Sequence, residues 1–203
     1  MDLFLVFHCP SYNALSSASL LVAIQKLLSV MKDVKITLRI RTENDISSSI
    51  LPRAVGIDIG PTEITNDMLS SLKPQTMIGY LTSKYLYTPE SLLTSIALSR
   101  GNFGTVIGFL EPSFDSPTKL ISAANRFWTD ATLSQDTPFI AFASTFLYDL
   151  EAFTNGGWEK VEFFSKRKFL SPLPALCASL ENNAQKPIMV NWDMVEQSAK
   201  SLM

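Results

Sequence analysis

The stretch LFLVFHCPSYNALSSASLLVAIQKLL at residues 3–28 decides the fold that the sequence predicts. It opens with a continuous apolar run at residues 3–7, which is typical of a strand buried on both faces of a parallel sheet. A polar turn follows, and apolar residues then recur almost all round a helical pattern, which predicts a buried helix. Ser11 or Asn13 can cap that helix.

Strand-like and helix-like patterns continue to alternate after this unit. Strands are predicted at residues 34–41, 54–59, 76–81 and 105–110, and helices at 44–51, 66–72 and 88–99. The strand at 34–41 alternates apolar and polar residues, which indicates one wet face near a sheet edge, whereas the strand at 54–59 is predicted to be buried on both faces. Thr65 can cap the helix that follows it. This order predicts an α/β fold with a mainly parallel sheet flanked by helices.

The second half of the chain has a different pattern. Helices are predicted at residues 117–128, 138–153, 172–180 and 194–202, and strands at 158–164 and 187–191. The C-terminal part is therefore expected to be helix-rich. We expect residues 1–110 to form an α/β core and residues 111–203 a helix-rich completion or cap with short strands, within the same compact domain.

The composition favours a subunit of a larger assembly. The chain has 203 residues, of which 46% are hydrophobic and 18% are charged, below the roughly 25% charged residues of an average soluble domain. A surface poor in charge is more often found on a subunit, so we expect a protein partner in a hetero-complex. The net charge is −2, and the basic cluster at residues 166–168 is best explained as a solvated turn. Nothing here has the electrostatic footprint of a nucleic-acid-binding protein.

The cysteines and the N-terminal residues help to predict the cellular compartment of the protein. Cys9 and Cys177 fit no metal-ligand spacing, and we predict two buried, reduced thiols. Asp2 stands where a signal peptide has positive charge, and no stretch reaches the roughly 18–20 apolar residues of a membrane span. The sequence therefore predicts a soluble intracellular protein, cytoplasmic or nuclear.

The turn after the first strand carries a family resemblance. Residues 8–18, HCPSYNALSSA, resemble the first motif of the DHH phosphoesterase superfamily, H-x-P-D-x-D-A-x-x-S-A, which is shared by RecJ-type exonucleases. The positions that match are His8, Pro10, Ala14, Ser17 and Ala18. Ser11 and Asn13 replace the two aspartates of the motif.

Later positions follow the order of the family's motifs only in part. Asp58 stands where the family has a second aspartate at a strand end, and Asp136 loosely matches a fourth. The place of the DHH triplet, residues 80–83, holds neither aspartate nor histidine. The resemblance implies a DHH-like fold over about residues 1–140, and a family reaction in which water between two divalent metals hydrolyses a phosphoester.

The replacement of the two aspartates of the motif by Ser11 and Asn13 affects the predicted binding of metals. Hard dications need carboxylate and imidazole ligands, and Ser11 and Asn13 are neutral. We therefore expect no two-metal catalysis, no bound metal and no cofactor. Backbone amides at the start of the helix still form an anion site at the end of a parallel strand. A vestigial phosphate pocket is predicted from His8, Ser11, Asn13, Asp58 and Asp136.

Three hypotheses follow for the function. The first is a catalytically inactive DHH-like domain that serves as a structural or scaffolding subunit, docked through surfaces around Trp158 and Phe163 or through the C-terminal helix. The alternative is a metal-dependent phosphoesterase, or a protein that binds phosphate or nucleotides. The third is an α/β protein-interaction module unrelated to that family.

Overall fold

The computed structural model describes residues 1–46, 50–101, 105–110, 120–123, 126–130, 137–147, 169–181 and 186–203. The strands are β1 (Asp2–His8), β2 (Lys35–Ile40), β3 (Val55–Ile59), β4 (Met77–Thr82), β5 (Tyr85–Tyr87), β6 (Val106–Gly108), β7 (Leu120–Ala123), β8 (Arg126–Asp130), β9 (Phe139–Phe142), β10 (Phe169–Leu173) and β11 (Cys177–Ser179). The helices are α1 (Ala14–Val30), the short 3-10 turn η1 (Glu43–Asp45), α2 (Asn66–Ser71), α3 (Ser91–Arg100), α4 (Ala143–Leu147) and α7 (Trp192–Lys200).

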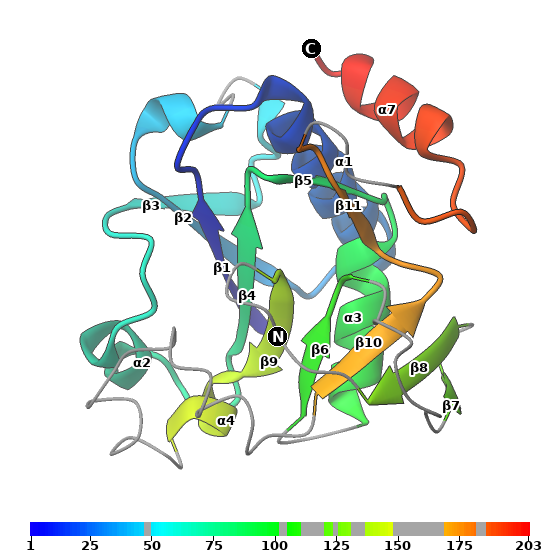
Figure 1. Ribbon diagram of the computed structural model, residues 1–203. Coiled ribbons are helices and arrows are strands. Elements are labelled where there is room, and N and C mark those ends of the chain that lie inside the picture. Colours follow the sequence, from blue (N-terminus) through cyan, green and yellow to red (C-terminus); the bar gives the residue numbers. More distant parts are fainter. Residues whose placement is uncertain are drawn as a thin grey trace.

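One mixed sheet organises the molecule. Its strand order is β3-β2-β1-β4-β9-β6-β10-β8-β7, and β11 and β5 form a separate two-stranded sheet (Figure 1). Strands β3, β2, β1 and β4 are all parallel. Strand β9 pairs antiparallel with both β4 and β6, and the β7–β8 hairpin pairs antiparallel with β10. The predicted α/β class with a parallel core is confirmed.

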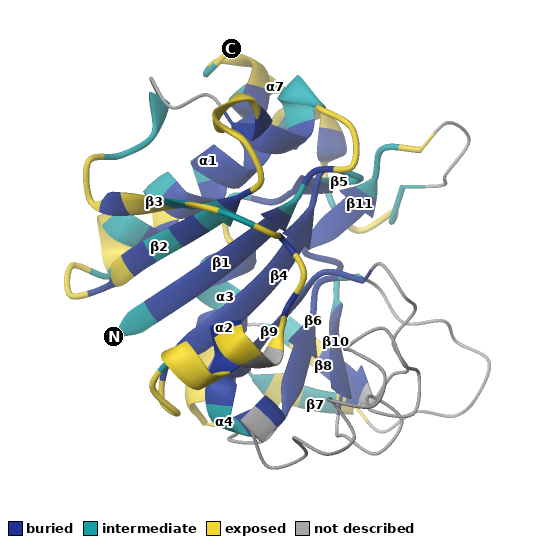
Figure 2. Cartoon of the chain, turned by 90° about the vertical axis from the view of Figure 1, so that its left-hand side faces the viewer, coloured by how far each residue is buried: buried dark blue, intermediate teal, exposed yellow. Residues whose placement is uncertain are grey.

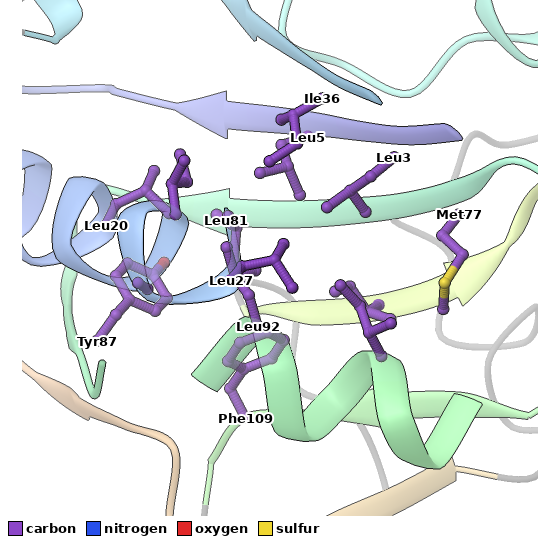
Figure 3. Close-up of a cluster of buried hydrophobic side chains, with 14 of the residues drawn as sticks. Leu3, Leu5, Leu20, Leu27, Ile36, Met77, Leu81, Tyr87, Leu92 and Phe109 are labelled. Atoms are coloured by element: carbon purple, nitrogen blue, oxygen red, sulfur yellow. The ribbon is translucent and has the colours of Figure 1, made fainter. Parts of the chain in front are cut away.

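The first strand and its helix form as the sequence predicts. Leu3, Leu5 and Phe7 of β1 belong to the larger hydrophobic cluster, whereas Phe4 and Val6 belong to the smaller one on the opposite face. Figure 3 shows leucines of β1, α1 and α3 packing together in the larger cluster. Because β1 is covered on both sides, a continuous apolar run suits it. The caps predicted for α1 and α2 are also confirmed, at Asn13 and Thr65.

The predicted helix-rich C-terminal part is wrong within the described residues. The residues predicted as a helix at 117–128 include β7 and the first part of β8, and those at 172–180 include the end of β10 and all of β11. Pairing across the sheet overrides the local pattern there, because Trp128 lies opposite Pro172 in the register of β8 with β10. The helix predicted at 138–153 begins as strand β9 and is helical only from α4, and its part beyond residue 147 lies outside the described residues.

Smaller corrections concern three other segments. The helix predicted at 44–51 is reduced to η1 in the described residues, and the strand predicted at 187–191 is turn and irregular chain. The aromatic strand predicted at 158–164, with Trp158 and Phe163, and the basic turn at 166–168 lie outside the described residues. The division into residues 1–110 and 111–203 stays a prediction. Among the described residues, no helix has the length and apolarity needed to cross a bilayer.

Strand β3 is an edge strand and is not buried on both faces as predicted. It pairs with β2 and is the terminal strand of the described sheet. Ile57 and Ile59 are 42% and 53% exposed. Figure 2 shows exposed and half-exposed residues along β3, in contrast to the buried β1 and β4. The apolar pattern of a short strand is the same for a central position and for an uncovered edge, and the local sequence does not separate them.

Candidate functional site

The candidate site lies at the carboxyl end of β1, where the order of the parallel strands changes direction. The chain passes from β1 to β2 and β3 on one side, and then returns to β4 on the other side of β1. Such a switch point is where ligands bind in open α/β sheets. Three segments meet the turn after β1 here. The backbone N–H of Ser83 donates to the His8 carbonyl over 3.0 Å, Thr62 contacts the His8 ring, and the hydroxyl of Ser17 reaches the carbonyl of Asp45 over 3.0 Å.

His8 is held by the loop that follows β3. Its Nδ1 atom lies 2.9 Å from the hydroxyl oxygen of Thr62, which is itself buried. The imidazole also stacks on the Tyr80 ring, with 6.1 Å between the centroids. One ring nitrogen is therefore engaged inside the protein.

Ser11 is exposed, and its contribution is made by the backbone. The Ser11 carbonyl accepts a hydrogen bond from the Ser83 hydroxyl over 2.8 Å and a longer one from the Cys9 thiol at 3.4 Å. Cys9 and Cys177 are both buried with free thiols, as predicted. Burial raises the pKa of both thiols above the usual range, that of Cys177 much further, so both stay protonated at neutral pH.

Asn13 caps the first turn of α1. Its side-chain oxygen accepts the backbone N–H of Ser16 over 3.1 Å, from an extended backbone conformation. This is the bond that a helix N-terminus needs, since its first N–H groups have no partner within the helix.

Replacing Asn13 by alanine is expected to lower the free energy of unfolding by about 1 kcal/mol, because the Ser16 N–H loses its acceptor. Asn13→Ser keeps an acceptor at the same place and should cost only a few tenths of that amount. Urea denaturation of both variants measures the difference. Equal losses in the two variants would show that the amide, and not the cap, stabilises the turn.

Asp58 is on the same edge of the sheet but is paired elsewhere. Its carboxylate lies 2.6 Å from a terminal nitrogen of Arg39 and accepts a second bond from Nε over 2.8 Å. The Arg39 guanidinium in turn lies over the Phe4 ring, 5.4 Å from its centroid. Asp58 is thus two strands away from β1 in the sheet order and is neutralised by its neighbour. The structure brings His8, Ser11 and Asn13 into one turn, while Asp136 lies outside the described residues.

Sequence reasoning missed Asp45, which orders the loop after β2. This buried carboxylate accepts the backbone N–H groups of Arg41 and Thr42 over 2.9 and 3.0 Å, and the Thr42 hydroxyl over 3.1 Å. The spacing Thr42-x-x-Asp45 is close to a capping-box pattern, and that signal was available in the sequence.

Tyr87 was also missed, and it fixes the end of β4. Its hydroxyl donates to the Thr82 carbonyl and accepts the Thr82 N–H, both over 2.8 Å, in a fully buried position. The backbone N–H of Tyr87 donates to the Ser19 hydroxyl over 3.1 Å. Strand β5 is thereby tied to α1 and to β4 at once.

The polar groups at this edge mostly bind one another. Among the described residues, no three His, Cys, Asp or Glu side chains gather in a way that suits a metal ion. The N-terminus of α1 lies at the end of β1, as predicted, and the phosphate pocket stays a prediction.

A cavity of about 170 Å³ opens beside the first turns of α1. Its lining is mostly apolar and consists of Tyr12, Ala14, Ser17, Ala18, Leu21, Ile50, Leu202 and Met203.

The chain matches no protein-family model, and no curated protein matches it either. Three of the solved structures that resemble it distantly illustrate the range of similarity. Francisella tularensis 2-C-methyl-D-erythritol 4-phosphate cytidylyltransferase is 11% identical with a TM-score of 0.46, and the match covers 100% of both chains. A 4-diphosphocytidyl-2C-methyl-D-erythritol synthase is 12% identical with a TM-score of 0.47, covering 97% of this chain and 98% of that one. Helicobacter pylori mannose-6-phosphate isomerase is 12% identical with a TM-score of 0.41, covering 85% and 86%.

These findings correct the DHH resemblance. No family model matches the chain, that of the DHH phosphoesterases included. The matching residues have a simpler physical origin in the packing of α1. Ala18 is buried, and the Ser17 hydroxyl bonds the carbonyl of Asp45. The need for small residues where a helix packs closely is enough to account for this part of the match.

Proposed function

We propose that this chain is a non-catalytic structural subunit that binds another polypeptide along the open edge of β3. One observation carries the proposal: β3 is the terminal strand of the sheet that the described residues form, and it has two half-exposed isoleucines. An uncovered apolar edge strand is a template for pairing with a further strand.

The backbone of β3 offers hydrogen-bonding groups to such a strand. The N–H of Gly60 donates to the Ile40 carbonyl over 3.0 Å, which directs the even-numbered residues of this segment toward β2. By the alternation of a β-strand, the N–H and C=O groups of Ile57 and Ile59 point away from β2. The partner strand would therefore gain backbone bonds and cover apolar side chains together.

Natural edge strands are usually protected by lysine, proline or an inward-pointing charge. The sequence of β3, VGIDI, contains a single charged residue, Asp58. Arg39 neutralises that charge within the same chain. The residues of β3 therefore give little protection against pairing with another strand. This favours the interpretation that a further strand normally occupies the edge.

Two further features support a structural role. At the carboxyl edge, the side chains of Asn13, Asp45 and Tyr87 are used in bonds within the chain, so these groups serve the fold. The C-terminal helix, which is one of the two predicted docking surfaces, buries Trp192, Val195 and Ala199 within the chain. Met194 of the same helix is 63% exposed, but the backbone of a helix is satisfied internally. We place the contact at β3 because its exposed isoleucines are accompanied by outward-pointing backbone groups.

Co-purification with matched lysine variants tests the proposal. Ile59→Lys places a charge on the edge, while Val30→Lys places the same charge at the end of α1, where Val30 is 55% exposed, close to the 53% of Ile59. We expect a protein, either an untagged second copy or a different chain, to co-purify with the tagged native chain and with Val30→Lys. Recovery with Ile59→Lys should fall roughly tenfold.

Equal recovery with both lysine variants would contradict the proposed function, and so would the absence of any stoichiometric partner of the native chain. Thermal denaturation of the two variants provides the control for folding. Both positions are half exposed, so we expect both variants to melt close to the native protein.

A further inference from the structure

We propose that the strand occupying the β3 edge is β3 of a second copy of this chain, in an antiparallel two-fold pair with Ile57 opposite Ile57. This inference rests on the proposed function and names the partner. The pair would continue the sheet from one copy into the other. A two-fold interface uses the same patch on both sides, so the strand must be complementary to itself.

The backbone meets that requirement in this register. Ile57 of each copy would exchange both backbone bonds with Ile57 of the other, and each Ile59 N–H would donate to the Val55 carbonyl of the second copy. The Val55 N–H is already bound to the Pro52 carbonyl over 2.9 Å within its own chain. The bonds between the copies therefore come from the N–H and C=O groups of Ile57, the N–H of Ile59 and the C=O of Val55, while the Ile59 carbonyl lies opposite an N–H that is already occupied.

The side chains select the same register. In the sheet, Ile57 lies beside Leu38 and Ile59 beside Ile40, so both belong to the face covered by the larger hydrophobic cluster. With Ile57 opposite Ile57, each Val55 lies opposite an Ile59, and this face is apolar along the whole contact. Cross-strand pairs of β-branched residues stabilise antiparallel sheets.

The neighbouring registers fit less well. A shift in one direction places Asp58 opposite Asp58, so that the two carboxylates and their Arg39 partners are crowded together on one face. The opposite shift places Ile59 against the exposed Arg53. In the selected register Asp58 lies opposite Gly56, which has no side chain, and keeps its ion pair with Arg39 at 2.6 Å. The strand is thus complementary to itself in one arrangement and poorly so in its neighbours.

The contact is short, because β3 has 5 residues. Interfaces well below the standard size are weak and reversible. We therefore expect a dimer whose fraction rises with concentration. Sedimentation velocity of the purified full chain between about 5 and 500 µM covers the range in which such an equilibrium is visible.

A charge-swap experiment tests the register as well as the contact. Ile57→Lys and Ile57→Glu should each remain monomeric, because the pair would place two like charges directly opposite one another. A 1:1 mixture of the two variants should dimerise again, because lysine then lies opposite glutamate. Val30→Lys should dimerise as the native chain does, which shows that an added charge elsewhere has no effect.

A native chain that is monomeric over the whole concentration range would overturn the inference. So would single variants that dimerise normally, or a mixture that stays monomeric. Restoration by mixing also excludes misfolding as the cause of the loss in the single variants. If the purified chain is monomeric while recovery of a different protein still depends on Ile59, the proposed function stands and only the identity of the partner is wrong.

Discussion

Leu5→Ala is expected to lower the free energy of unfolding by about 2–5 kcal/mol. Leu5 is fully buried in the central strand, among the leucines shown in Figure 3. Its removal leaves a cavity between β1 and the helices, and a central strand paired on both sides has little freedom to collapse into it. Equilibrium unfolding in urea, followed by circular dichroism and tryptophan fluorescence, measures the loss.

A second substitution, at Gly79, tests whether the loss of packing around Leu5 causes the destabilisation. A Cβ atom at Gly79 would lie 2.6 Å from Cδ2 of Leu5 and 3.2 Å from Cγ1 of Ile140. Gly79→Ala should therefore cost roughly 1–3 kcal/mol in the native chain. In the Leu5→Ala background the new methyl group enters the space that Leu5 has left, and the cost should fall close to zero.

Gly56→Ala is the matched control for this cycle. A Cβ atom there would meet only the Ile36 carbonyl oxygen, at an ordinary contact distance of 3.8 Å. We expect a change within about 0.5 kcal/mol. If Gly79→Ala costs the same with and without Leu5, the two residues are not in competition for one volume, and the packing described for β1 and β4 is wrong.

Tyr87→Phe is expected to cost about 2–4 kcal/mol, although only one oxygen atom is removed. That oxygen is both donor to the Thr82 carbonyl and acceptor from the Thr82 N–H. Tyr87 is 1% exposed, so no solvent replaces the lost bonds. Burial also raises the pKa of the phenol well above its usual range, and the group stays neutral through the physiological range of pH.

Tyr12→Phe serves as the control for this substitution. Tyr12 is 59% exposed, and loss of its hydroxyl should change the unfolding free energy by less than about 0.5 kcal/mol. Urea denaturation at pH 7 compares the two variants. A small loss for Tyr87→Phe, similar to that of Tyr12→Phe, would mean that the end of β4 is held by the strand pairing alone.

The parallel half of the fold was predictable because its signals are local. Residues 3–7 form a continuous apolar run, and Asn13 and Thr65 are caps that precede clear helical patterns. Each of these signals acts within a few residues of the chain. Their physical cause, unpartnered N–H groups at a helix start, does not depend on the rest of the molecule.

The mixed half was not predictable in the same way, because its strands depend on distant partners. The pattern at residues 117–128 is compatible with a helix, yet its described residues belong to strands β7 and β8, which pair with each other, and β8 pairs with β10. Strand β9 is short and wholly apolar, and such runs fit a buried helix or a buried strand equally well. Its two partners, β4 and β6, decide the outcome.

In the candidate site, too, local contacts were predictable from the sequence and contacts between distant segments were not. The cap at Asn13 was predicted, and it follows from the turn itself. The partners of His8 and Asp58 were not predicted, because Thr62 comes from another loop and Arg39 from the register of β2 with β3. A side chain's bonds decide whether it is available to a ligand, and those bonds lie outside the local sequence.

The place of β9 in the sheet has a consequence for biosynthesis. Strand β4 is paired with β1 on one side, but its other side is completed by β9, which is made only when translation has reached Phe142. Until then the growing polypeptide carries two incomplete sheet margins, one at β3 and one at β4. A ribosome-bound intermediate of this length therefore exposes an unpaired edge at β4 that the complete sheet covers, and such edges are prone to misassembly.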